Sequence, residues 1–483
     1  MRLRVIQKIL GLLLSTFSLA LVPPLLLAHW FDDGATQAFF IAIAVIFSAG
    51  LILWWPVRKI EEEIKLRDGF IIVVMFWVVL GAIGSIPFML VDELNMSLPD
   101  AIFESLSGLT TTGATVIVGI DHLPPSILFY RQLLQWLGGM GIIVLAVAIL
   151  PILGVGGMQL YRAETPGPMK DAKLTPRITE TAKALWYIYL GLTLACALAY
   201  FLSGMGPFDA ITHSFSTVAI GGFSTHDSSL GYFDNPLIEA VAVFFMFLAG
   251  INFSLHFLAW RNRNAKYYIF DSEFKLYATV TVIVCLLCGI GLSLTLYQGD
   301  WIQAFRVGIF QAVSIGTTTG FTTTSFQSWP GFLPVLLIFS SFIGACAGST
   351  GGGIKVIRVL LLYKQGRREI QRLVHPSAII TIKMGGRPVS GRVVDAVWGF
   401  FVTYIAVFAL LLLSVMAAGL DQITAFSAVA ACFNNLGPGL GEVSSHYGAL
   451  PSNAKMILGF AMVLGRLEIF TLLVLLTPAF WRA

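Results

Sequence analysis

The chain has 483 residues, of which 57% are hydrophobic and only 12% are charged. This balance excludes an ordinary soluble domain, in which about a quarter of the residues carry charge. Uncharged windows of about 20 residues, long enough for a helix to cross a hydrocarbon core, recur along the chain. The sequence therefore predicts an all-α integral membrane protein.

Ten transmembrane helices are predicted from these windows. The first could be read as a signal peptide, since Arg2, Arg4 and Lys8 precede it. Its apolar part is too long for that, and no small-residue cleavage site follows, so we keep it as a helix. The ten spans lie near residues 9–28, 36–57, 69–91, 132–160, 184–206, 240–259, 276–299, 331–354, 396–420 and 456–480.

The basic residues predict the orientation of these helices. All but four of the 30 lysines and arginines fall within residues 1–8, in alternate connections between spans, or at Arg482. Because cytoplasmic loops collect basic residues, both termini are predicted to be cytoplasmic. The net charge of +4 is explained by these loops and indicates no nucleic-acid partner. The basic loop 355–395 is either an ordinary cytoplasmic loop or a docking face for anionic lipid or an acidic protein.

Four long outward connections, which are only weakly charged, repeat one pattern. The sequence DAIFESLSGLTTTGAT begins at Asp100, and DAITHSFSTVAIGGFS begins at Asp209. In both, the Asp-Ala-Ile triplet precedes a glycine at the same spacing, and the third and fourth connections carry similar apolar runs before a glycine. These glycines are Gly113, Gly222, Gly320 and Gly437. The chain is therefore predicted to contain four copies of one unit.

Each unit is predicted to consist of a transmembrane helix, a short re-entrant pore helix, a filter loop centred on the glycine and a second transmembrane helix. The first two spans fall outside this repeat. The predicted organisation is a two-helix appendage at 1–57, followed around a central pore by repeats at 69–160, 180–260, 274–363 and 394–483.

The chemistry of these loops indicates a cation path. About ten apolar residues precede each glycine, too few to cross the bilayer, so a re-entrant helix fits them better. Asp100 and Asp209 are predicted to be N-caps of two such helices, and each helix directs its partly negative C-terminal end at the loop. Threonine and small residues then let backbone carbonyl oxygens replace the water around a monovalent cation. The alternative, helix packing through small residues, explains one such cluster better than four in register.

A second glycine-rich segment interrupts the third unit. In GACAGSTGGGIKVIR, residues 344–358, small residues break a helical pattern that continues to about residue 363. We interpret this segment as a mobile loop that gates the path, because the interruption is found in the third unit only; a packing kink is the alternative. Arg466 and Glu468 lie in the last span, and their spacing disfavours mutual pairing. Arg466 is therefore either a fixed positive charge that anchors the gate, or one half of another internal ion pair.

The segments TTTG, AIGG, TTTG and NNLG, each following a short apolar helix, resemble the filters of the superfamily of bacterial Trk and Ktr and plant HKT potassium transporters. The two additional N-terminal spans and the sequence GSTGGG resemble the TrkH-type members in particular. The resemblance covers essentially the whole chain. It implies a gated potassium-uptake channel of the bacterial inner membrane, a homodimer with one pore per subunit, and a cytoplasmic ring of nucleotide-binding TrkA subunits. Any nucleotide is expected on that partner, because this chain lacks the G-x-x-x-x-G-K-[ST] motif.

Carried over by position, the resemblance implies that potassium is bound by oxygens of four loop segments. These are Thr110, Thr111, Thr112, Gly113; Ala219, Ile220, Gly221, Gly222; Thr317, Thr318, Thr319, Gly320; and Asn434, Asn435, Leu436, Gly437. The implied gate consists of Gly344, Gly348, Ser349, Thr350, Gly351, Gly352 and Gly353, with Arg466 below the filter. The fourth segment departs from the threonine pattern and is followed by Pro438, which lacks a backbone donor. This departure argues against strictly fourfold coordination.

Two other functions compete with a gated channel. A symporter coupled to sodium or protons would need a carboxylate on the ion route, and Glu468 is the only candidate. A membrane-embedded enzyme would need a catalytic motif such as H-E-x-x-H or G-x-S-x-G, and the chain has neither. The sequence therefore predicts a transporter and not an enzyme.

Overall fold

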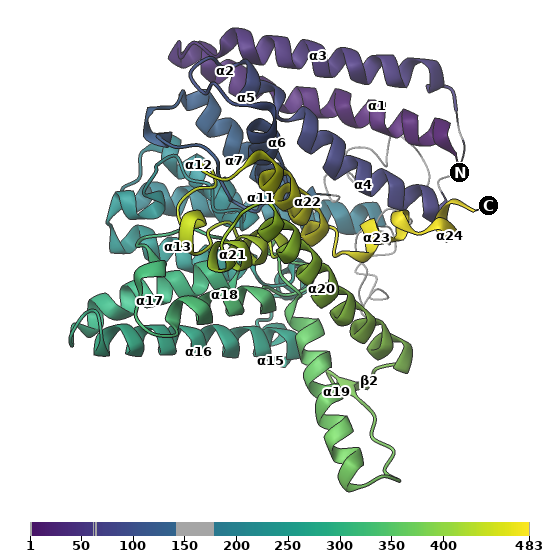
Figure 1. The fold of residues 1–483 in the computed structure, drawn as a ribbon, viewed down its shortest axis with the longest axis vertical. Helices are drawn as coiled ribbons and strands as arrows, with labels where there is room; N and C mark the ends of the chain where they lie inside the picture. The colour runs from purple at the N-terminus through teal and green to yellow at the C-terminus, as the bar shows by residue number, and fades with distance from the viewer. Residues whose placement is uncertain (1, 61, 63–64, 142–177, 483) are drawn as a thin grey trace.

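The computed structural model describes residues 2–60, 62, 65–141 and 178–482. The regular structure of these residues is almost entirely helical, as the sequence predicts (Figure 1). The strands found there form one small hairpin, in which β1 (Lys383–Met384) pairs antiparallel with β2 (Arg387–Pro388). The predicted span 132–160, and with it part of the predicted first repeat, lies partly outside the described residues.

The N-terminal helices form a layer along one side of the bundle (Figure 1). They are α1 (Leu3–Ala20), α2 (Val22–Phe31), α3 (Thr36–Trp54) and η1 (Trp55–Val57). α1 and α3 cross closely because Gly11 faces Gly50: a Cβ atom on Gly11 would lie 2.8 Å from the Gly50 carbonyl oxygen. Small residues permit such close contacts between helices in membranes.

Four groups of helices follow, one for each predicted repeat. The first comprises α4 (Leu66–Ile83), α5 (Ile86–Leu90), α6 (Leu98–Leu109), η2 (Ile120–His122) and α7 (Pro125–Gly139). The second comprises α11 (Ile178–Leu202), α12 (Pro207–Ala219), η3 (Ser229–Phe233), α13 (Pro236–Ala249) and α14 (Phe253–Arg261). The third comprises α15 (Lys266–Phe270), α16 (Ser272–Leu294), α17 (Trp301–Gly316), η4 (Phe326–Ser328), α18 (Leu333–Ile343) and α19 (Val356–Val374). The fourth comprises α20 (Gly391–Ala417), α21 (Gln422–Phe433), η5 (Gly441–Val443), α22 (Ser452–Arg466), α23 (Phe470–Leu476) and α24 (Pro478–Trp481).

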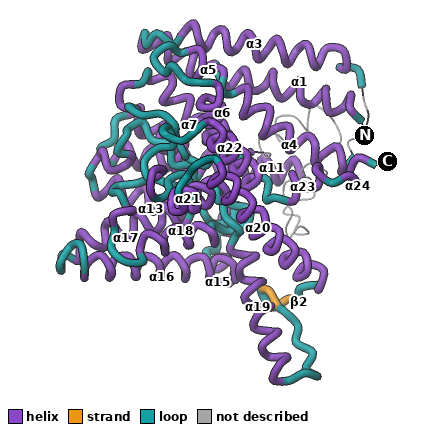
Figure 2. The backbone as a smooth tube through the Cα atoms, in the orientation of Figure 1, coloured by secondary structure: helices purple, strands orange, loops and turns teal. Residues whose placement is uncertain are grey.

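The loops that follow the short helices gather inside the molecule. Figure 2 shows much of the loop structure concentrated in the centre of the bundle and at the end away from the chain termini. The two termini lie near each other, because the Arg2 amide donates to Asp68 and Arg67 donates to the Arg482 carbonyl. Both ends of the chain therefore meet the start of α4.

Three of the predicted spans are broken helices. α13 and α14 meet at 93°, α22 and α23 meet at 114°, and the loop 344–355 separates α18 from α19. The predicted spans at 240–259 and 456–480 are therefore each formed by two helices and not by one. The breaks in the second and fourth units are short, whereas the glycine-rich interruption of the third unit is a 12-residue loop. α22 ends because Glu468 and Ile469 adopt left-handed backbone angles, with φ of 51° and 63°. No glycine or proline stands at these two positions to mark the break in the sequence.

The number of spans changes accordingly. Among the described residues, six helices are long and apolar enough to cross a membrane, or eight if each bent pair counts as one span. The apolar part of predicted span 331–354 is the 11-residue helix α18, which is too short to cross alone. The prediction is confirmed in its coarser form, an all-helical chain with several apolar spans.

The short helices α6 and α12 start earlier than predicted. α6 follows Ser97, whose hydroxyl accepts the Asp100 N–H at 3.4 Å, and α12 starts at Pro207. Asp100 and Asp209 are therefore third in their helices and are not N-caps, because Pro99 and Pro207 favour the first helical turn. Both carboxylates still lie near the positive end of the helix dipole.

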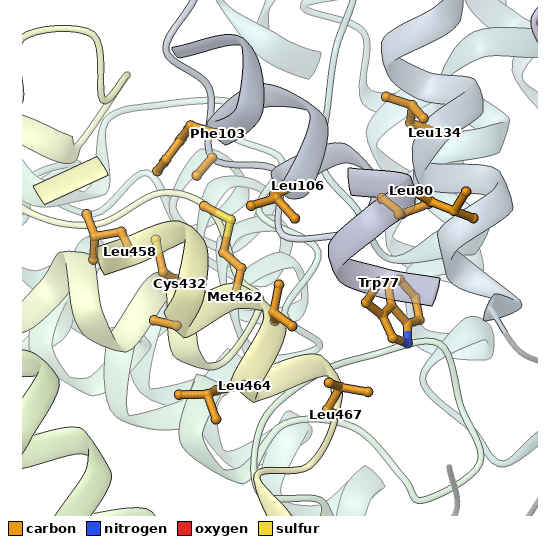
Figure 3. Packing of buried hydrophobic residues seen from close by; sticks show 14 of the residues in the cluster. Trp77, Leu80, Phe103, Leu106, Leu134, Cys432, Leu458, Met462, Leu464 and Leu467 are labelled. Atoms are coloured by element: carbon orange, nitrogen blue, oxygen red, sulfur yellow. The ribbon is translucent and has the colours of Figure 1, made fainter. Parts of the chain in front are cut away.

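The first and fourth repeats share a hydrophobic core. Figure 3 shows side chains of α4, α6, α7, α21 and α22 meeting there, with Trp77, Phe103 and Met462 almost fully buried. Because lipid tails are as apolar as these side chains, close packing, and not exclusion from water, holds such helices together. This core fixes α6 against α22 and so places the loops at their ends.

Candidate ion-conducting site

The four short helices α6, α12, α17 and α21 end in the same backbone motif. One residue at each end is left-handed, with φ of 56°, 54°, 70° and 54° for Thr111, Ile220, Thr318 and Asn435. The next residue donates its N–H five positions back at 2.7–2.9 Å: Thr112 to Ser107, Gly221 to Ser216, Thr319 to Ser314 and Leu436 to Ala431. This is the Schellman motif, which usually has glycine in the left-handed position. The four loops therefore start with equivalent geometry.

The left-handed residues are unusual because none of them is glycine. A β-branched residue at positive φ is an outlier, and Thr111, Ile220 and Thr318 are all β-branched. Such backbone strain costs about 1–3 kcal/mol per residue and persists only where the surrounding structure enforces it, as it often does at ligand sites. The sequence pattern contains no signal for these angles.

The glycines that follow close a ring. Gly113, Gly222, Gly320 and Gly437 have φ of 80°, 79°, 88° and 99°, which glycine alone adopts readily. A Cβ atom added to each would collide with a carbonyl oxygen of the next unit, and the fourth unit meets the first. The facing oxygens belong, in that order, to Gly221, Thr319, Leu436 and Thr112. The structure therefore brings all four predicted filter segments together in one closed ring.

One face of this ring opens into a cavity of about 650 Å³. All four ring glycines line the cavity, and the residues that follow them form its walls. These walls are irregular backbone, which membrane proteins tolerate where it is buried in protein or lines a water-filled space. The cavity has room for a cation that still carries its water shell.

The other face of the ring is covered by the loop 344–355. Three hydrogen bonds hold this loop: Thr350 Oγ1 donates to the carbonyl of Val218, the residue before the second segment (2.9 Å), the Gly352 N–H donates to Thr318 Oγ1 in the third (2.7 Å), and the Gly353 N–H donates to the Asn434 carbonyl in the fourth (3.1 Å). Because these acceptors precede the ring glycines, the loop lies on the side opposite the cavity.

Arg466 connects the first segment to the same loop. Its guanidinium donates to Thr111 Oγ1 at 3.1 Å and to the Thr350 carbonyl at 3.0 Å. It also donates to the carbonyls of Gly138 and Gly139. The loop and Arg466 together are bonded to the first, third and fourth segments and to the residue before the second, and they place a permanent positive charge next to the ring.

The predicted site residues are largely gathered at this place. The non-glycine residues of the four segments are at most 1% exposed. In the predicted gate, Gly344 and Gly353 lie against one another, and Gly351 and Gly352 face the backbone of Thr317 and Asn434. Gly348 and Ser349 do not reach the ring: the Gly348 carbonyl accepts the N–H of Phe253, and Ser349 donates to Cys346 within the loop.

The side chains around the ring differ between units. Threonine hydroxyls pair at 2.8 Å in the first unit, Thr110 with Thr112, and in the third, Thr317 with Thr319. In the fourth unit, Asn435 instead donates to the Thr112 hydroxyl at 3.0 Å, so its amide joins two segments. The departure of the fourth segment from the threonine pattern thus has a structural counterpart.

Sequence reasoning did not identify a buried ion pair beside the cavity. Arg131 Nε donates to Glu104 Oε1 at 2.9 Å, and both side chains are at most 1% exposed. Arg131 also donates to the Ser224 carbonyl at 3.0 Å, and Glu104 accepts the Val116 N–H at 2.9 Å. The pair therefore ties the first unit to the second. The sequence did offer a signal, because Glu104 and Arg131 are charged residues within apolar segments. Charged residues inside a membrane are usually paired or functional.

The loop 344–355 is also held by acidic residues from outside the ring. Glu273 accepts the Ala347 N–H at 2.7 Å and the Ile357 N–H at 3.1 Å, so one carboxylate joins the loop to the first turn of α19. Glu468 forms an ion pair with Arg358, the second residue after Val356. Arg466 and Glu468 thus have different partners, as predicted, and no observation favours Glu468 as a carboxylate on an ion route.

Comparison with known proteins agrees with this geometry. Residues 35–482 match the family model TrkH, described as "Cation transport protein". The chain is 59% identical to the Trk system potassium uptake protein TrkH of Vibrio parahaemolyticus and 54% identical to that of Escherichia coli, with 100% of each chain covered. The crystal structure of the potassium transporter TrkH from Vibrio parahaemolyticus matches with a TM-score of 0.91 at 56% identity, covering 100% of both chains. The chain therefore belongs to the TrkH family of cation transport proteins.

Proposed function

We propose that this chain takes up potassium through a pore whose selectivity filter is the ring of four loop segments. The observation that carries the proposal is the meeting of four equivalent, glycine-centred bends in one closed ring at the base of a cavity. The relatives compared above are named potassium uptake proteins, which are transporters and not enzymes. Potassium is then the transported ion, and the backbone oxygens of residues 110–113, 219–222, 317–320 and 434–437 are its ligands.

The ligand chemistry supports a monovalent ion. The four segments contain no aspartate or glutamate, whereas calcium sites in proteins usually include carboxylates. Uncharged carbonyl oxygens can replace the hydration shell of potassium, which holds its water weakly. The short helices α6, α12, α17 and α21 also end at the ring, so their partly negative ends favour a cation there.

In this proposal the loop 344–355 is the gate. In the structure, the loop covers the face of the ring opposite the cavity. Ions pass when the loop moves away from this face. Its hydrogen bonds to the third and fourth segments and to Val218, and the contacts of Arg466 to Thr350 and Thr111, support this role. The positive charge of Arg466 adds an electrostatic barrier to cation passage.

Control of the gate is assigned to a TrkA-type ring of nucleotide-binding subunits, on a homodimer of this chain in the bacterial inner membrane. α19 follows the loop directly and projects, with the hairpin β1–β2, away from the bundle (Figure 1). Arg367 and Arg372 are exposed on α19, so a partner bound there can pull on the loop. Basic residues at this end, and the meeting of both termini at α4, support a cytoplasmic location for the termini.

The filter assignment is tested with Gly113→Ser and Gly320→Ser. A serine side chain at these positions collides with the Gly221 and Leu436 carbonyls, so we expect weaker selectivity for potassium over sodium. The measurements are potassium-dependent growth of a transport-deficient strain and ion flux into liposomes. Gly191→Ser is the matched control, because a Cβ at Gly191 meets nothing within 4 Å. Wild-type selectivity in both filter variants would contradict the assignment.

A further inference from the structure

Two carbonyl oxygens of the ring are already bonded to protein side chains. The Tyr447 hydroxyl donates to the Gly437 carbonyl at 2.7 Å, and Gln135 Nε2 donates to the Gly221 carbonyl at 2.7 Å. Tyr447 is 1% exposed and Gln135 is fully buried. In the second unit and in the fourth, one ring carbonyl oxygen therefore already accepts a hydrogen bond from a side chain, which leaves it less available to an ion.

The first and third units differ in this respect. Within the described residues, no donor is bonded to the carbonyl oxygens of Thr112, Gly113, Thr319 or Gly320. Their threonine hydroxyls pair with one another and with helix carbonyls, as Thr110 does with Leu106, and leave the ring oxygens free for an ion. Since the units follow one another around the ring, the first and third face each other across it.

Both donors are held firmly in place. Gln135 Oε1 accepts the Phe223 N–H at 3.1 Å, so the amide of Gln135 brackets the backbone of the second segment. The Tyr447 N–H donates to the Thr115 carbonyl at 2.7 Å, and its ring lies 5.4 Å from that of Phe103. Neither donor can leave its carbonyl without losing a second contact.

We propose that Tyr447 and Gln135 are specificity-determining residues, which weaken one ion ligand in the fourth and one in the second unit. The two bonded oxygens lie at different positions of their segments, since Gly221 is third in its segment and Gly437 is fourth. Complete oxygen sets then remain in the first and third units only. This inference rests on the proposed function of the ring as a potassium filter. Selectivity for potassium over sodium depends on the number of carbonyls that coordinate the ion. Each donor takes one carbonyl out of the full set, so each donor lowers the preference for potassium over sodium.

The test is Tyr447→Phe, which removes the hydroxyl and keeps the ring, measured as the potassium-to-sodium permeability ratio of the full-length protein in liposomes. Release of one carbonyl from a hydrogen bond predicts a rise of about two- to fivefold in this ratio. Gln135→Met predicts a rise in the same direction. Tyr130→Phe is the control for the first variant, because the Tyr130 hydroxyl donates at 2.8 Å to the Gly84 carbonyl, outside the ring.

Gln132→Met is the control for Gln135→Met. Gln132 lies on the same helix and donates at 3.2 Å to the Phe223 carbonyl, one residue beyond the ring. A higher ratio in the target variants with unchanged controls supports the proposal. An unchanged or lower ratio in Tyr447→Phe, with a wild-type melting temperature, overturns it, even if Gln135→Met fails to fold. This outcome is distinguishable from a failure of the filter assignment itself. If the ring is not the filter, Gly113→Ser and Gly320→Ser retain wild-type selectivity.

Discussion

Gly352→Ala is expected to displace the loop 344–355 from the ring of four segments. A Cβ at residue 352 collides with the Asn434 carbonyl, which is backbone and cannot move aside. The loop must shift, and it then loses the bonds from the Gly352 N–H to Thr318 Oγ1 (2.7 Å) and from the Gly353 N–H to the Asn434 carbonyl (3.1 Å). Each hydrogen bond contributes about 1 kcal/mol. Loss of both, about 2 kcal/mol, raises the ratio of displaced to seated loops by roughly 30-fold.

The assay is the open probability of single channels in planar bilayers, supported by initial rates of rubidium uptake. Gly366→Ala is the matched control, since Gly366 lies in α19 and a Cβ there meets nothing within 4 Å. We expect a large increase in open probability for Gly352→Ala and none for Gly366→Ala. An unchanged open probability in a folded Gly352→Ala protein would refute the idea that the seated loop closes the path.

Two further predictions concern the loops around the cavity. Glu104→Gln leaves the buried guanidinium of Arg131 without its counter-charge, so we expect a loss of about 3–5 kcal/mol in stability, seen as a lower melting temperature; an unchanged melting temperature would show that the pair is dispensable. Desolvation opposes the charge of His226, but the Asp209 carboxylate 3.7 Å away and the hydrogen bond to Asp121 at 2.6 Å outweigh it and raise the pKa of His226 above its ordinary value. The protonated bridge therefore stabilises the fold below about pH 6.5 and is lost as the pH rises through the raised pKa. We expect a higher melting temperature at pH 6 than at pH 8.5, and a difference that persists in His226→Gln would contradict this cause.

Much of the architecture was predictable from local sequence. The resemblance drawn from TTTG, AIGG, TTTG and NNLG is confirmed by the family match over residues 35–482. Helices were predicted well because a segment in lipid must satisfy its own backbone hydrogen bonds, so that a long apolar run becomes a helix. The bends within 240–259 and 456–480 were not predicted, because an apolar window has the same composition whether its helix is straight or broken.

The four segments that meet in the ring were predictable from the sequence, but their contacts were not. The glycine spacing identified the four segments, yet the left-handed angles of Thr111, Ile220 and Thr318 carry no sequence signal. Gln135 and Tyr447 were also missed, since a glutamine on an apolar helix and a tyrosine in a loop are individually unremarkable in sequence. Their positions matter only because the fold carries them to the carbonyls of the ring.

The amino-acid sequence alone determined the membrane class, the four glycine-centred units and the interruption at 344–358, because uncharged runs and glycine spacing are local properties of the chain. The tertiary structure decided which oxygen faces which glycine, that the units close into a ring, and that the loop 344–355 sits beneath it. Those features depend on contacts between distant segments, such as the bond from Asn435 to Thr112 across 323 positions. Such contacts form only when several helices pack together, so no local pattern encodes them.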